Sequence, residues 1–126
     1  MKMFTGTAAV LLLTAAPFGI VTASAHHGWS GYDSTKPLNL TGSIKESGYE
    51  HPHGFVSLEV PASAAGAGKV WRVVLAPPSR MENRGLPREM LKAGTTVSVV
   101  GYPHRTDGEE MRAERITVGG KTVELR

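Results

Sequence analysis

The residues of this sequence best suited to chemistry are five histidines, and they occur in clusters. His26 and His27 are adjacent, His51 and His53 flank a proline, and His104 lies further along the chain. The 126-residue chain contains no cysteine, which excludes disulfides, thiolate metal sites and a thiol nucleophile. Imidazole and amine nitrogens are therefore the main candidate metal ligands.

The first 25 residues have the pattern of a cleavable signal peptide. Lys2 precedes an apolar stretch that Pro17 and Gly19 interrupt, and small residues follow as far as Ala25. The apolar stretch is shorter than the roughly 20 residues that a membrane-spanning helix needs. We therefore expect residues 1–25 to be removed. The mature protein is then predicted to be periplasmic or secreted and to have no membrane span.

Such cleavage would make His26 the first residue and would give it a free α-amine. The amine and the imidazole Nδ1 of His26 would then bind one metal together. A distant histidine would complete a planar set of three nitrogens, called a histidine brace, which suits Cu(II). The preferred distant ligand is His53, followed by His104 and His51. The second mature residue, His27, offers another mode through the amine, a deprotonated amide and its imidazole.

Other interpretations of these histidines stay open. Three or four imidazoles would also suit zinc. The terminal pair is also consistent with a solvated arm, and the remaining histidines with polar loop positions, in which case no metal binds. A copper-dependent oxidase would use the same ligands. A mature chain of about 100 residues leaves little room for a shaped substrate cleft, so we do not expect an enzyme.

The elements that must position the histidines are mainly β-strands. Alternating or β-branched apolar residues predict six strands, at 38–46, 55–60, 70–75, 95–102, 110–118 and 121–125. Between the third and fourth strands, Ser79 and Glu82 predict a capped helix that stops at Gly85. A second short helical segment is predicted over residues 86–92.

Three strands, a helical connection and then further strands are the order of an OB-like Greek-key β-barrel. We therefore predict an all-β domain of five to six strands over residues 38–126, preceded by an arm over residues 26–37. A small open sandwich of the same strands is the alternative. In the arm, Trp29 and Tyr32 are expected to pack against the barrel. In the fifth strand, Arg112 and Glu114 are expected to share a face and to pair.

Composition and charge limit the classes of partner. The formal net charge is +3, and both signs are interspersed along the chain, so nucleic-acid binding is not expected. The predicted partner is a metal ion or a periplasmic protein. The alternative to Cu(II) binding or delivery is a metal-free binding module that uses the barrel face for a peptide, a glycan or an envelope partner.

Six short motifs follow one another through residues 26–126. They are His26-His27, Leu40-Thr41-Gly42, Pro52-His53, Leu91-Lys92-Ala93-Gly94, Gly101-Tyr102-Pro103 and Arg112-Ala113-Glu114-Arg115-Ile116. Their order resembles a family of small exported bacterial proteins known only as a domain of unknown function, DUF6152. That family commonly has Asn-Pro-His at the first turn, so His53 matches the pattern and His51 departs from it. The resemblance implies an exported OB-like barrel and supplies no activity.

Overall fold

The computed structural model describes residues 28–63 and 66–126 of the chain. The predicted signal peptide, residues 1–25, lies outside the described residues, and so do His26 and His27. Within the part that is described, no helix is both long enough and apolar enough to cross a bilayer.

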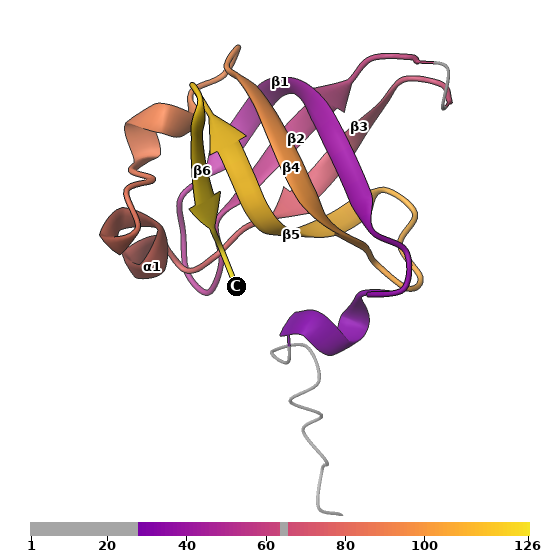
Figure 1. Ribbon diagram of the computed structural model, residues 1–126, viewed down its shortest axis with the longest axis horizontal. Coiled ribbons are helices and arrows are strands. Elements are labelled where there is room, and N and C mark those ends of the chain that lie inside the picture. The colour runs from indigo at the N-terminus through magenta and orange to yellow at the C-terminus, as the bar shows by residue number, and fades with distance from the viewer. Residues whose placement is uncertain (1–27, 64–65) are drawn as a thin grey trace, which may run out of the picture.

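The described residues form one sheet that closes on itself. Its strands are β1 (Leu38–Gly48), β2 (Phe55–Val60), β3 (Lys69–Val74), β4 (Thr96–Pro103), β5 (Glu110–Val118) and β6 (Lys121–Glu124). They lie in the order β3-β2-β1-β4-β5-β6, and β3 also pairs in parallel with β5. This additional pairing closes the first five strands into a barrel, and β6 lies against the outer edge of β5 (Figure 1). The predicted OB-like barrel is confirmed, and the open sandwich is wrong.

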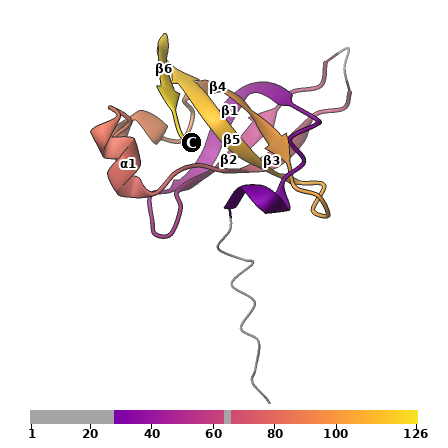
Figure 2. The same ribbon diagram turned by 60° about the horizontal axis from the view of Figure 1, so that its bottom comes forward.

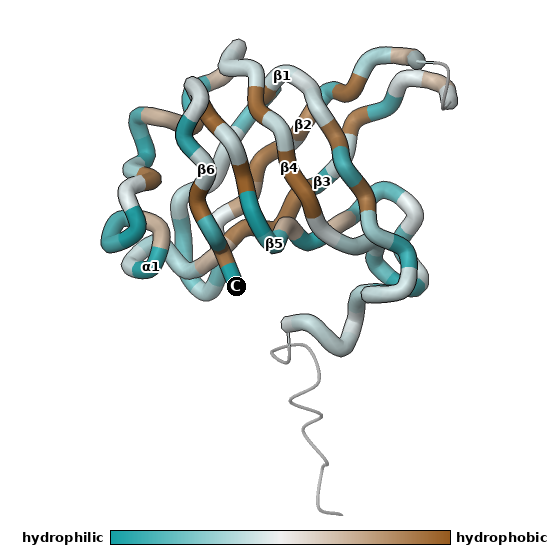
Figure 3. Tube along the Cα trace, in the orientation of Figure 1, coloured by the Kyte–Doolittle hydropathy of each residue, from teal (hydrophilic) through white to brown (hydrophobic). Residues whose placement is uncertain are grey.

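The alternation of apolar and polar residues explains why these segments form strands. In β2, Val56 and Leu58 are fully buried while Glu59 is exposed, and in β4 Val97 and Val99 alternate with more exposed neighbours. Successive side chains of a strand point to opposite faces, so each strand contributes one apolar row to the barrel interior. Figure 3 shows these apolar positions recurring along the strands.

The helical connection between β3 and β4 adds to the same core. It consists of α1 (Pro78–Asn83) and a 3-10 turn, η3 (Arg88–Leu91), which lie beside the barrel (Figure 2). Met81 and Leu91 are fully buried in the barrel core. The predicted capping box is wrong, because Ser79 lies inside the helix and no side chain caps its start. The helix begins instead at a proline, whose missing N–H and preset φ suit its first position.

Gly85 ends this helical segment in the left-handed conformation, with φ of 83°. A residue with a Cβ is strained there by about 1–2 kcal/mol. We therefore expect Gly85→Ala to lower the free energy of unfolding by about 1 kcal/mol, measured by urea denaturation. Gly85→Asn is the control, because asparagine tolerates this conformation better and should lose less stability. Equal losses in the two variants would contradict the explanation by backbone strain.

Candidate functional site

Backbone hydrogen bonds join the arm to the connection between β4 and β5. The described part of the arm starts with a 3-10 turn, η2 (Gly28–Gly31), and Tyr32 then forms an antiparallel bridge with His104. The Arg105 N–H donates to the carbonyl oxygen of Gly31 at 2.9 Å. The arm therefore lies at the end of the barrel where the loop after β4 emerges (Figure 1).

Two aromatic side chains strengthen this contact. Tyr32 is 8% exposed, and its hydroxyl donates to Oε2 of Glu110 at 2.8 Å. Its ring meets the His104 ring edge-on, with 5.3 Å between the ring centres. The Trp29 ring lies 4.4 Å from the guanidinium carbon of Arg112. The prediction that Trp29 and Tyr32 pack the arm against the barrel is confirmed.

A pocket of about 300 Å³, called the arm pocket from here on, lies between the arm and the barrel. It is lined by Gly28, Gly31, Tyr32, His53, Val74, His104, Glu110 and Arg112. A neighbouring hollow of about 240 Å³ shares Tyr32 and His53 with it and adds His51. The fold thus brings His53 and His104 into one pocket and places His51 beside it. Within residues 28–63 and 66–126, no group of three or more His, Cys, Asp and Glu residues could hold a metal ion.

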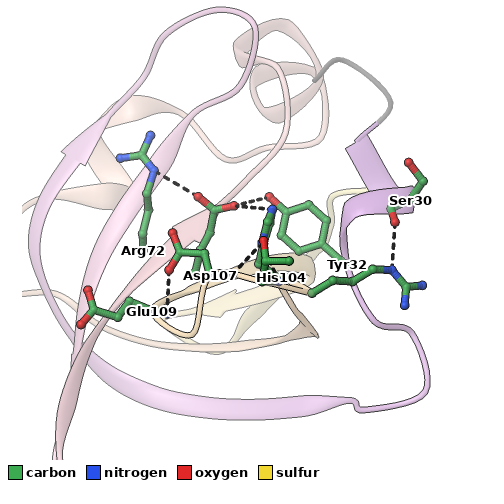
Figure 4. Close-up of polar contacts among 9 residues, drawn as sticks. Ser30, Tyr32, Arg72, His104, Asp107 and Glu109 are labelled. Atoms are coloured by element: carbon green, nitrogen blue, oxygen red, sulfur yellow. Dashed lines mark hydrogen bonds and ion pairs between the residues drawn. The ribbon is translucent and has the colours of Figure 1, made fainter. Parts of the chain in front are cut away.

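The imidazole of His104 is hydrogen-bonded within its own loop. Its Nδ1 accepts hydrogen bonds from the N–H groups of Asp107 at 2.9 Å and Thr106 at 3.2 Å. An unprotonated Nδ1 places the proton of the neutral ring on Nε2. That nitrogen lies 4.0 Å from Oε2 of Glu110 (Figure 4). A metal at Nε2 would have to displace this proton, so His104 is a poorer ligand than its position suggests.

His53 has the opposite arrangement. Its Nε2 lies 3.3 Å from Nη2 of Arg112, and a guanidinium can only donate hydrogen bonds. In this pair the lone pair of Nε2 accepts the hydrogen bond. The same lone pair is what a metal ion would need, so Arg112 occupies the position from which a metal would bind His53.

Arg112 is the residue of this site that sequence reasoning missed. The predicted pair between Arg112 and Glu114 is wrong, because Glu114 instead forms ion pairs with Arg115 at 3.9 Å and Arg126 at 3.5 Å. A β-bulge at Glu114 interrupts the alternation of β5. Arg112 is 5% exposed, although its neighbours Met111 and Ala113 face the barrel core. Trp29 of the arm lies over the Arg112 guanidinium, so the arm contributes to this burial.

Burial shifts the pKa values of two side chains that line the pocket, Tyr32 and Arg112. Burial, followed by the hydrogen bond to Glu110, raises the pKa of Tyr32 far above its usual value, so the hydroxyl keeps its proton. Burial lowers the pKa of the Arg112 guanidinium, which still stays charged at neutral pH. Glu110 also lies 3.7 Å from Nε of Arg72 (Figure 4). None of the ion pairs in the described residues includes Arg112.

Comparison with solved structures found chains of similar fold. The mitochondrial single-stranded DNA binding protein Rim1 of S. cerevisiae superposes with a TM-score of 0.50 at 12% identity, over 67% of this chain and 93% of that chain. At this identity the likeness to Rim1 concerns the fold alone. TiaS, in its complex with a transfer RNA and ATP, gives a TM-score of 0.48 at 18% identity, over 75% of this chain and 20% of that one.

Comparison of sequences places the chain in a family. No curated protein matches it. The family of unknown function DUF6152 matches residues 15–112, which is well over half of the chain. This small β-barrel protein therefore belongs to the DUF6152 family.

Proposed function

We propose that the protein binds Cu(II) in the arm pocket through the α-amine and imidazole of His26 and the imidazole of His53. The observation that supports this proposal is the position of Gly28, which lines the arm pocket together with His53 and His104. His26 is two residues before Gly28 in the sequence, and two extended residues span at most about 7 Å. A chain that begins at His26 would therefore have its terminus within reach of the pocket.

The hydrogen bonds of the pocket indicate which of the other histidines is the better metal ligand. His53 is the favoured third ligand because its Nε2 carries a lone pair, which Arg112 must release when the metal binds. His104 ranks below it because its Nδ1 accepts two backbone hydrogen bonds. His51, in the neighbouring hollow, and His27, through its amide, are alternatives. The proposal makes the protein a periplasmic or secreted carrier of copper, without catalytic activity, and makes zinc the competing metal.

The decisive comparison is between two forms of the protein that differ only at the N-terminus. One form begins at His26 with a free α-amine, and the other begins at His26 with an acetylated α-amine. Acetylation turns the α-amine into an amide, which removes one of the three nitrogen ligands. We expect the acetylated form to bind Cu(II) at least about tenfold more weakly and to lose the EPR signature of a three-nitrogen site. Zn(II) competition in the same titration identifies the preferred metal.

His53→Ala then tests the third ligand, with His51→Ala as the matched control from the same loop. We expect the His53 variant to lose affinity for Cu(II) and the His51 variant to keep it. Equal, weak binding by both N-terminal forms would exclude the brace. Mass spectrometry of the exported protein comes first, because a mature N-terminus at any other residue would remove the proposal.

A further inference from the structure

Arg112 presents a buried positive charge to the arm pocket and has little to neutralise it. The side chain is 5% exposed, and its Nε has no hydrogen-bond partner among the described residues. Its Nη2 donates to a neutral acceptor, Nε2 of His53, at 3.3 Å. A guanidinium has five N–H donors, and a buried charge is normally paired with an opposite charge. The binding capacity of Arg112 is therefore largely unused by the described part of the chain.

The indole of Trp29 determines how a ligand would approach this guanidinium. The ring lies 4.4 Å from the guanidinium carbon. At this distance the ring covers part of the guanidinium. A ligand in the pocket would meet the N–H groups that the ring does not cover, and paired N–H donors of this kind suit an oxyanion.

The surrounding charges favour an anion. After burial, the charges of Arg80 and Arg126 further lower the pKa of Arg112, so two other cations act on this guanidinium. The carboxylate that lines the pocket, Glu110, accepts the hydroxyl hydrogen bond of Tyr32 and lies 3.7 Å from Arg72. Glu110 therefore has partners of its own, and it forms no ion pair with Arg112.

We propose that the arm pocket binds a carboxylate group, on a small organic acid or at the C-terminus of a peptide, through Arg112. A carboxylate presents two oxygens in one plane, which matches the parallel N–H donors of a planar guanidinium. The pocket volume of about 300 Å³ suits a small group. The proposal requires no metal, so the metal-free protein tests it separately from copper binding.

The test is an NMR titration of the metal-free exported protein, labelled with ¹⁵N. Sodium acetate and N-acetylalanine are the probes, with sodium chloride at matched ionic strength as the control. We expect saturable shifts of the Arg112 side-chain N–H and the Trp29 indole N–H with the carboxylates, and no saturable shift with chloride. Tighter binding of N-acetylalanine supports a peptide C-terminus, and tighter binding of acetate supports a small free acid.

Two variants test whether carboxylate binding needs the planar guanidinium of Arg112 or only its positive charge. Arg112→Lys keeps the charge but loses the planar pair of donors, and we expect it to weaken carboxylate binding about tenfold. Arg115→Lys is the matched control, because Arg115 pairs with Glu124 on the neighbouring strand and does not line the pocket. Wild-type protein that shows no saturable shift with either probe would overturn the proposal even if the Arg112 variant failed to fold. Tighter binding of inorganic phosphate than of acetate would overturn the choice of a carboxylate.

Discussion

Tyr32→Ala is expected to detach the arm from the barrel and to lower the free energy of unfolding by about 3 kcal/mol. The change removes a ring that is 8% exposed, its edge-on contact with His104 and its hydrogen bond to Glu110. Thermal or urea denaturation measures the loss. Faster hydrogen exchange at the Arg105 N–H, which donates to Gly31 in the arm, would locate the loss at the arm.

Tyr32→Phe separates packing from hydrogen bonding in the same residue. Phenylalanine keeps the ring and removes the hydroxyl, so we expect a loss of about 1 kcal/mol. The Arg105 N–H should stay protected in this variant. A loss as large as that of Tyr32→Ala would show that the hydrogen bond to Glu110, and not the ring, holds the arm. An unchanged stability in Tyr32→Ala would contradict the role of Tyr32 as an anchor.

Gly101→Ala is expected to lower the free energy of unfolding by about 3 kcal/mol, because there is no room for a side chain between β4 and β5. A Cβ at Gly101 would collide with the backbone oxygen of Arg112 and would lie 2.8 Å from the Cα of Ala113. Both atoms belong to the backbone, so the two strands would have to separate next to the bulge. The same movement would displace Arg112 and alter the arm pocket.

The matched control for this variant is Gly108→Ala, in the loop between the same two strands. A Cβ at Gly108 meets no described atom within 4 Å, and Gly108 is not among the glycines with positive φ. We expect its effect on the free energy of unfolding to stay within about 0.5 kcal/mol. Chemical denaturation of both variants measures the difference. Similar stabilities for the Gly101 and Gly108 variants would contradict the steric argument.

Much of the fold could be predicted because strand formation leaves a local pattern. Alternating apolar residues identified the strands, including the last one, which follows β5 after two glycines, Gly119 and Gly120, that both have positive φ. The start of α1 was mispredicted because a proline and a potential capping serine are neighbours, and the pattern does not decide which of them begins the helix. The barrel closure rests on pairing between β3 and β5, which local pattern does not encode.

The candidate site could be predicted only in part. Clustered histidines drew attention to His53 and His104, and the structure brings these two into one pocket. Their hydrogen bonds to Arg112 and to Thr106 and Asp107 decide which nitrogen keeps a lone pair. The copper site stays a prediction, because His26 and His27 lie outside the described residues.

The sequence by itself determined that the protein is a small β-domain without thiol chemistry, because residue type and strand alternation are local properties. It also placed Arg112 in the fifth strand. Only the tertiary structure decided that this arginine is buried, because the burial comes from Trp29 and the rest of the arm, more than 70 residues earlier in the chain. Contacts between segments so far apart depend on how the barrel closes and where the arm packs. Because of these contacts, Arg112 lines a pocket.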